Sequence, residues 1–204
     1  MSNDVKQRIL SESMQLMLNH GIKVMTMDEL AKRIGVSKRT IYEHFEDKDT
    51  LLIAILNHHK KQTQQQSKTN LKNSPTVIHA VFHVLTNVES SLFSKVISRY
   101  DEIKRYHPDV YSKIICDNEN QEIKKTKYLF ELGIKQGVFR KDLNVEIIAP
   151  LLRSFFLQLW NNENGLREQF PFEKIFETFM QIFIRGCCTE KGLDVVESLT
   201  QKND

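Results

Sequence analysis

The sequence predicts an all-α protein, and three observations support this prediction. Only 7 glycines and 4 prolines interrupt the 204 residues, so helices meet few breaking points. Apolar residues recur three and four positions apart along most of the chain, whereas the apolar–polar alternation of strands is scarce. Hydrophobic residues make up 40% and charged residues 27%, a composition typical of a soluble chain with a sizeable buried core. We therefore expect helices joined by short connections.

The first helix is expected over residues 4–20. Gly21 follows it, and glycine readily adopts the left-handed conformation that ends a helix. The spacing of a helix places five residues on one face: Val5, Ile9, Ser13, Leu16 and Met17. This face is the expected contact with the next two helices.

A helix-turn-helix is predicted to follow. The segment T-M-D-E is a capping box, in which Thr26 caps the second helix and Glu29 reaches back. That helix carries apolar residues at helical spacing: Met27, Leu30, Ala31 and Ile34. It stops at Gly35, and the hydroxyl of Ser37 can cap a third helix over residues 38–45.

The rest of the chain is also predicted to be helical. Asp47 is expected to cap a fourth helix running toward residue 65, and the polar segment 62–75 is interpreted as a helix end and a loop. We therefore expect a domain over residues 1–47 and a larger one over 48–204, with helix 48–65 connecting them. Further helices are predicted over these residues: 77–92, 108–115, 118–136, 145–160 and 172–186. Asn144 is a candidate cap for the fourth of these, and Pro150 should bend it.

The third helix combines a small apolar anchor with an unusually polar surface. Ile41 and Phe45 lie four positions apart and can pack against the first two helices. No acidic residue occurs between Leu30 and Tyr42, although four cations do: Lys32, Arg33, Lys38 and Arg39. The whole chain is nearly balanced, with a net charge of +3, so this is a local positive field. The pattern fits a helix that enters the DNA major groove, and it also fits a solvated helix of an ordinary bundle.

Residues 26–52, T-M-D-E-L-A-K-R-I-G-V-S-K-R-T-I-Y-E-H-F-E-D-K-D-T-L-L, resemble the DNA-binding signature of the tetracycline-repressor (TetR) family of bacterial regulators. Residues 9–21 are similar, more loosely, to the first helix of that family. Ser13 and Met17 stand where alanine and phenylalanine are usual, so we expect this part of the core to be packed differently. The resemblance implies a helical DNA-binding domain followed by a larger helical domain for effector binding and dimerisation.

The resemblance also implies a homodimer that reads a palindromic operator in double-stranded DNA. The residues implied to contact phosphates are Thr26, Ser37, Tyr42, His44 and Lys48. Those implied to face base edges are Lys38, Arg39, Thr40 and Glu43. Glycine is frequent in the family at the position of Arg39. An arginine there can pair with guanine, or it can point along the backbone.

The family's larger domain holds a ligand pocket and a dimer interface formed by its last two major helices. The candidate interface residues are Leu152, Phe155, Phe156, Leu159, Phe176, Phe179 and Phe183. An intramolecular core is the alternative for them. Seven aromatic residues are candidates for a pocket that takes an apolar or aromatic effector, although most are expected in core or on the surface: Phe82, Tyr100, Tyr106, Tyr111, Tyr128, Phe130 and Trp160.

Other classes of function find little support. His79 and His83 have the spacing of metal ligands, but they share a polar stripe and no nearby cysteine or carboxylate completes a site. No nucleophile with a base can be assembled, so we expect no catalysis, no cofactor and no metal. The three cysteines, Cys116, Cys187 and Cys188, are interpreted as structural thiols. Without a secretory signal or a membrane-spanning run, a cytoplasmic protein is expected.

The function expected from these observations is that of a DNA-binding transcriptional regulator, a repressor released by a small-molecule effector. The alternative is an effector-independent DNA-binding protein with an architectural or chromosome-organising role.

Overall fold

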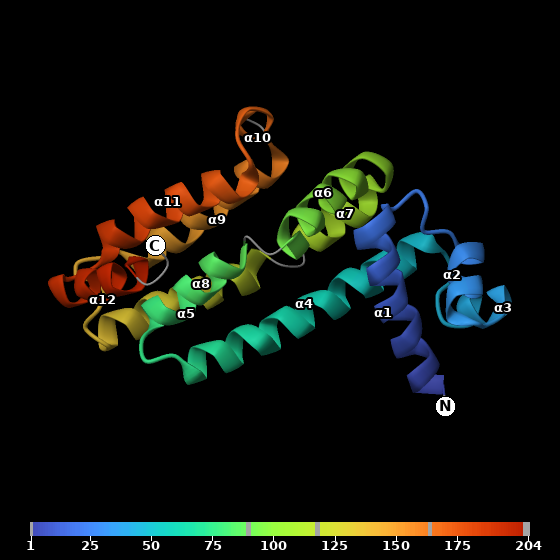
Figure 1. Ribbon diagram of the computed structural model, residues 1–204, viewed down its shortest axis with the longest axis horizontal. Helices are drawn as coiled ribbons and strands as arrows, with labels where there is room; N and C mark the ends of the chain where they lie inside the picture. The colour runs from blue at the N-terminus through green and yellow to red at the C-terminus, as the bar shows by residue number, and fades with distance from the viewer. Residues whose placement is uncertain (1, 89–90, 117–118, 163–164, 202–204) are drawn as a thin grey trace. The chain divides into compact units, whose positions relative to one another are not determined.

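A computed structural model describes residues 2–88, 91–116, 119–162 and 165–201, and it is built from α-helices (Figure 1). Those residues contain no strand; a single bridge pairs Phe139 with Cys188. The predicted all-α class is therefore confirmed. The contacts divide the chain into two compact units: unit 1 comprises residues 1–66 and 95–117, and unit 2 comprises residues 67–94 and 118–204.

Unit 1 contains the predicted helix-turn-helix. Its helices are α1 (Ser2–His20), α2 (Met27–Ile34), α3 (Lys38–Tyr42), the first part of α4 (Lys48–Asn73), most of α6 (Ser91–Tyr106) and α7 (Pro108–Cys116). One apolar core joins them, and α6 and α7 supply Ile103, Val110 and Ile114 to it. The core residues of the first three helices include Ile9, Leu16, Met17, Leu30 and Ile41. The expected inner face of the first helix is thus confirmed, and Ser13 is buried with it.

Unit 2 has a separate core that is rich in aromatic rings. Its helices are α5 (Val77–Val88), α8 (Glu119–Lys135), α9 (Val145–Asn161), α10 (Leu166–Gln169), α11 (Phe172–Cys187) and α12 (Glu190–Thr200). The ring of Phe139 approaches α8 so closely that a Cβ atom at Gly133 would lie 2.2 Å from it, so only glycine fits there. Phe130 packs against Phe139 and Phe183 at ring-centroid distances of 5.4 and 6.0 Å.

Three predicted features of the helices need correction, and three helices in the described residues were not predicted. Helix α4 continues to Asn73, because glutamine and lysine are good helix formers and no glycine or proline occurs before Pro75. The predicted loop within 62–75 is therefore wrong. Helix α3 ends at Tyr42 rather than Phe45, and Asn144 precedes α9 without a side-chain cap bond. Helices α6, α10 and α12 were not predicted; Thr189 caps α12 by accepting a hydrogen bond from the Gly192 N–H.

The two units contain different segments of the chain from the two domains that were expected to meet at residue 47. The sequence places everything after that residue in the larger domain, whereas α6 and α7 pack with the helix-turn-helix. Helix α4 runs without interruption from unit 1 into unit 2. No helix in the described residues combines the length and the apolar character needed to cross a membrane.

The buried cysteines fit the structural role expected of them. Cys187 and Cys188 are free thiols in the core of unit 2, and burial raises the pKa of Cys188 to about 11. A thiol that stays protonated at neutral pH is a poor nucleophile. The side chain of Cys116 lies outside the described residues.

Ser13 is a polar residue in an otherwise apolar position of unit 1. Its side chain is fully buried, and its hydroxyl makes no hydrogen bond to any described residue. A buried hydroxyl without a partner lowers stability, because it gives up its hydrogen bonds to water.

We predict that Ser13→Ala raises the thermal unfolding midpoint of the protein. Removing the unpaired hydroxyl should add about 1 kcal/mol to the free energy of unfolding. Ser11→Ala is the matched control: Ser11 lies on the same helix, exposed, where the substitution brings the same change in helix propensity without releasing a buried hydroxyl. Equal shifts in the two variants would contradict this account of Ser13.

Candidate nucleic-acid interface

The turn between α2 and α3 depends on the backbone of one glycine. Gly35 has φ 73° and ψ 37°, a left-handed conformation that strains other residues, and no atom beyond those of its chain neighbours lies within 4 Å of the place its Cβ would take. The N–H groups of Gly35 and Val36 both donate to the carbonyl of Ala31. Glycine is needed here for conformation rather than for space, and it lets α3 begin directly after α2.

Two predicted side-chain caps are present in this region. The Glu29 N–H donates to the Thr26 hydroxyl over 3.2 Å, and the Thr40 N–H donates to the Ser37 hydroxyl over 3.0 Å. Each cap uses the oxygen as an acceptor. The hydroxyl oxygens of Ser37 and Thr40 also lie 2.8 Å apart. The caps therefore start both helices at the places that the sequence predicts.

The four residues expected to read bases lie on or directly after α3. Lys38, Arg39 and Glu43 are exposed, and Thr40 is half-buried. The Nε of Arg39 donates to Oε1 of Glu43 over 3.1 Å, one turn further along the chain, and 89% of the Arg39 side chain is exposed. Lys38 binds instead to Asp28 on α2, with Nζ 3.0 Å from Oδ2. Both cations are thus held by carboxylates on the surface of the helix-turn-helix.

The residues expected to contact phosphates do not form one uniform group. Thr26, Ser37 and Tyr42 are exposed, and His44 is half-buried beside Phe45, with ring centroids 6.4 Å apart. Lys48 is half-buried, and its Nζ donates to the carbonyl of Ile22 over 2.6 Å. Burial lowers the pKa of the Lys48 ammonium. Lys48 therefore has a structural contact within unit 1 that its position in the sequence did not suggest.

Ile22 is held from both sides by residues distant in sequence. Its carbonyl accepts from Lys48 on α4, and its N–H donates to Oε2 of Glu102 on α6 over 2.8 Å. Arg99 forms an ion pair with the other carboxylate oxygen of Glu102 and also donates to the carbonyl of Leu18. Sequence reasoning missed this arrangement, because its partners are 26 to 81 residues apart and share no local pattern.

The seven candidate pocket residues are divided between the two units. Tyr100 and Tyr111 pack on the core of unit 1, and exposed Tyr106 lies under the Lys23 ammonium, 4.5 Å from its ring centroid. In unit 2, Phe82 and Phe130 are buried in the core, Trp160 is half-buried and Tyr128 is exposed. Of the seven residues, the core of unit 2 brings together Phe82 and Phe130.

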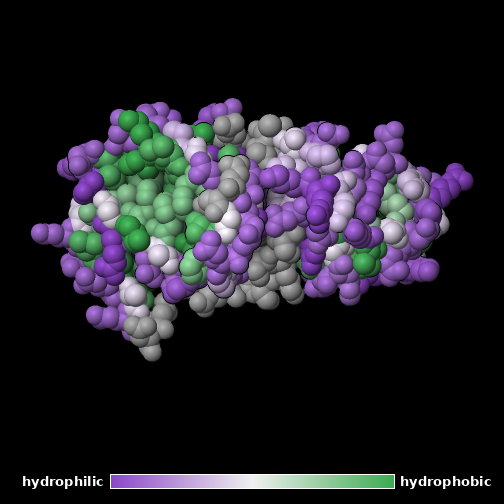
Figure 2. All heavy atoms as spheres, turned by 90° about the horizontal axis from the view of Figure 1, so that it is seen from above, coloured by the Kyte–Doolittle hydropathy of each residue, from purple (hydrophilic) through white to green (hydrophobic). Residues whose placement is uncertain are grey.

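The candidate dimer residues line α9 and α11, which contact each other through stacked rings. Phe155 and Phe179 have centroids 3.6 Å apart, and Phe156 lies 5.4 Å from Phe176. Leu159 is buried within its own chain, whereas the other six candidates are half-buried. On the same two helices, three apolar side chains are mainly exposed: Ile147, Leu151 and Ile182. Figure 2 shows apolar residues gathered on one face over unit 2.

The two histidines with metal-ligand spacing have local partners. His79 Nδ1 lies 2.9 Å from the Thr76 hydroxyl, and His83 Nδ1 lies 3.4 Å from the Asn70 amide nitrogen. Among the side chains that the structure describes, no group of three potential metal ligands comes together.

Comparison with known proteins gives consistent results. Residues 9–55 match the family described as bacterial regulatory proteins, tetR family. The chain is 38% identical over 196 residues to the uncharacterized HTH-type transcriptional regulator YvkB of Bacillus subtilis (strain 168), covering 88% of this chain and 95% of that protein.

Solved structures share the fold. A transcriptional regulator from Cytophaga hutchinsonii ATCC 33406 superposes with a TM-score of 0.73 at 18% identity, covering 89% of this chain and 97% of that one. A regulator from Saccharomonospora viridis in complex with choline has a TM-score of 0.69 at 18% identity, covering 90% of this chain and 96% of that one.

The Ile22 arrangement leads to a prediction about Glu102. Glu102→Ala should leave the buried Ile22 N–H without its acceptor and lower the free energy of unfolding by about 1–3 kcal/mol. Hydrogen exchange at the Ile22 amide should then be faster. Glu102→Gln keeps an acceptor oxygen and should have a smaller effect, and replacement of the neighbouring exposed Asp101 by alanine provides the control. Unchanged exchange at Ile22 in Glu102→Ala would rule out this hydrogen bond.

Proposed function

Because this chain belongs to the tetR family of bacterial regulatory proteins, we propose that it is a repressor that binds a palindromic operator as a homodimer and is released by a small-molecule effector. DNA-binding transcriptional regulation is the function of the family; the repressor role, the operator and the effector are our proposal. Such a regulator acts in the cytoplasm, and we place this protein there.

The observation that carries the proposal is the surface of α3. Ile41 and Phe45 are buried, with 0% and 2% exposure, so the helix is held against unit 1 by one side. Arg39 and Glu43 lie on the exposed side. A guanidinium can offer two parallel N–H donors to O6 and N7 of guanine in the major groove. The ion pair with Glu43 uses the Nε of Arg39, so the two terminal nitrogens can take that role.

Phosphate contacts would place this helix on the duplex. We assign them to Thr26, Ser37, Tyr42, His44 and Lys48, and base readout to Lys38, Arg39, Thr40 and Glu43. The Thr26 hydroxyl oxygen accepts the capping bond, so its proton can still be donated to a phosphate. Lys48 donates one of its three ammonium N–H groups to the Ile22 carbonyl, and the other two remain for a phosphate. Binding should therefore weaken steeply with salt, as expected for contacts to phosphates.

The dimer is proposed to form through α9 and α11. Ile147, Leu151 and Ile182 are 54%, 62% and 69% exposed in the single chain, which is unfavourable for large apolar side chains in water. Phe155 and Phe179 lie on the same pair of helices and extend this apolar face. A second copy that covers the face would bury it, and two copies would then present two α3 helices to the two halves of a palindrome.

The effector is proposed to be an apolar or aromatic small molecule that binds in unit 2, near Phe82 and Phe130. The solved regulator in complex with choline supports a small-molecule ligand as a class for this fold. Helix α4 connects the two units, so a ligand that favours one position of this helix changes the population of the DNA-binding state.

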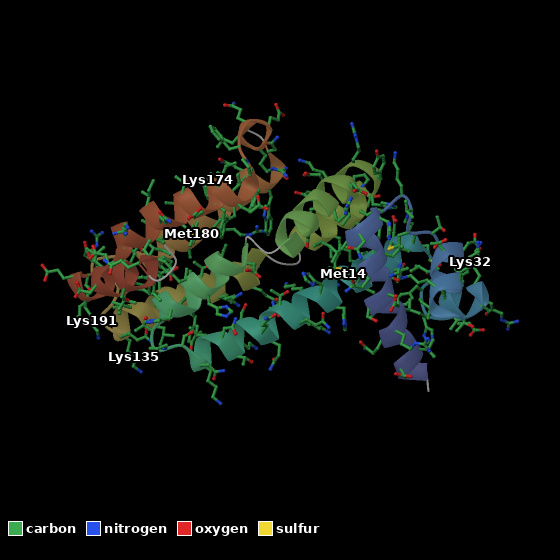
Figure 3. The ribbon with its side chains drawn as sticks, viewed as in Figure 1. Met14, Lys32, Lys135, Lys174, Met180 and Lys191 are labelled. Atoms are coloured by element: carbon green, nitrogen blue, oxygen red, sulfur yellow. The ribbon has the colours of Figure 1, made fainter. Side chains whose placement is uncertain are left out.

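Base readout by Arg39 can be tested with a binding selection on randomised half-sites. We expect Arg39→Ala to weaken the preferred sequence by about 1–3 kcal/mol and to relax preference at one base pair per half-site. Lys32→Ala, which removes an exposed cation from α2 (Figure 3), is the control and should leave the consensus unchanged. The same sharp consensus from wild type and Arg39→Ala would exclude Arg39 as a base reader.

The dimer proposal is tested by charging exposed positions on α9 and α11. Leu151→Glu and Ile182→Glu should produce folded monomers, because a carboxylate buried without a partner in the interface is costly. Sedimentation would measure the mass and circular dichroism the helix content. Ser198→Glu, at an exposed polar position of α12 and so outside α9 and α11, is the matched control. Folded dimers from Leu151→Glu and Ile182→Glu would place the interface elsewhere.

A further inference from the structure

One ion pair joins the two helices of the helix-turn-helix at the surface expected to meet DNA. Nζ of Lys38, the first residue of α3, lies 3.0 Å from Oδ2 of Asp28, in the first turn of α2. The two side chains are 48% and 66% exposed. Asp28 is flanked by residues of the capping box, and nothing in the sequence assigns it a role toward DNA.

The pair changes what Lys38 can offer to a duplex. The hydrogen bond to Asp28, followed by the attraction of its charge, raises the pKa of Lys38, so the lysine remains an ammonium. That ammonium already has an anionic partner. To bind a phosphate it would have to leave the carboxylate, and the carboxylate would then lie unpaired beside the negative backbone.

Affinity for DNA of arbitrary sequence comes mainly from cations that replace counterions at phosphates. Each such contact adds about 0.9 to the slope of log affinity against log salt. A cation held by a carboxylate contributes less to this sequence-independent affinity. It can still turn its remaining N–H donors toward an acceptor on a base edge, where the operator provides one.

We propose that Asp28 is a specificity-determining residue, whose carboxylate keeps the Lys38 ammonium on the α2–α3 surface and withholds it from phosphates of non-operator DNA. This inference rests on the proposed function, because it requires that α3 reads DNA. In this role, Asp28 lowers binding to non-operator DNA rather than increasing binding to the operator.

A general effect of charge is the competing explanation. Removing any carboxylate from unit 1 makes the protein more positive and raises its affinity for DNA. The chain offers a matched control, because Glu12 on α1 pairs with Arg33 on α2 at the same distance, 3.0 Å between Oε2 and Nε. These side chains are also partly exposed, at 41% and 38%. Glu12→Gln changes the net charge by the same amount as Asp28→Asn.

The experiment measures binding of the full-length protein to two short fluorescent duplexes over a salt series. One duplex is a pool of random sequence, and the other carries the consensus recovered by the half-site selection. The variants are Asp28→Asn, Lys38→Gln, the double variant and Glu12→Gln. Their thermal unfolding midpoints show that each remains folded.

We expect Asp28→Asn to bind the random duplex more tightly, with a salt slope steeper by about 0.9 per head. Between about 50 and 200 mM salt, its affinity should then fall roughly three- to fourfold more per head than that of wild type. Its preference for the consensus over the random pool should decrease. In the Lys38→Gln background, Asp28→Asn should not steepen the slope, since the released cation is absent. Glu12→Gln should keep the wild-type preference.

Three outcomes would overturn the inference: an unchanged slope in Asp28→Asn, the same increase in the Lys38→Gln background, or an equal loss of preference in Glu12→Gln. Each of these can occur while wild type binds the consensus duplex normally, and the proposed function would then stand. If wild type bound neither duplex, the proposed function itself would be contradicted.

Discussion

The burial of two side chains positions the part of this protein that is proposed to read DNA. Helix α3 is five residues long, and a helix of that length does not form by itself in water. It is stable here because Ile41 and Phe45 are inserted into the core of unit 1. Ile41 lies on α3 and Phe45 comes shortly after its end, so their burial also determines which side of α3 faces the core. Arg39 and Glu43 are exposed as a consequence of this orientation.

The same core includes helices from much later in the chain. Ile103, Val110 and Ile114 of α6 and α7 are buried with the residues of α1 and α2, and Glu102 bonds to the backbone of Ile22. Unit 1 is therefore more than a three-helix module attached to a larger domain. A displacement of α6 would disturb the turn between α1 and α2, because the Ile22 N–H is buried and has its acceptor there.

The two surfaces of functional interest satisfy opposite physical requirements. The α2–α3 surface is charged, and its Lys38 and Arg39 are paired with carboxylates, which suits reversible contact with a polyanion. The α9–α11 face instead exposes Leu151 and Ile182, whose burial against another apolar surface would be favourable. The proposed pairing through α9 and α11 and the proposed readout through α3 thus belong to different units of the chain.

By itself, the sequence determined those features that arise between residues close together in the chain. The caps at Thr26 and Ser37 are contacts between residues three positions apart. The stop of α2 at Gly35 and the buried face of α1 follow from a single glycine and from the helical spacing of apolar residues. The DNA-binding signature is equally local, because residues 26–52 form one continuous segment. The end of α4 was misplaced because the polar residues of 62–73 fit both a loop and a helix. Tertiary structure alone decided that α6 and α7 join unit 1, that Lys48 and Glu102 bind Ile22, and that Asp28 pairs with Lys38. These contacts link residues 10 to 80 positions apart, and only the packing of helices on a shared core brings such side chains within hydrogen-bonding distance.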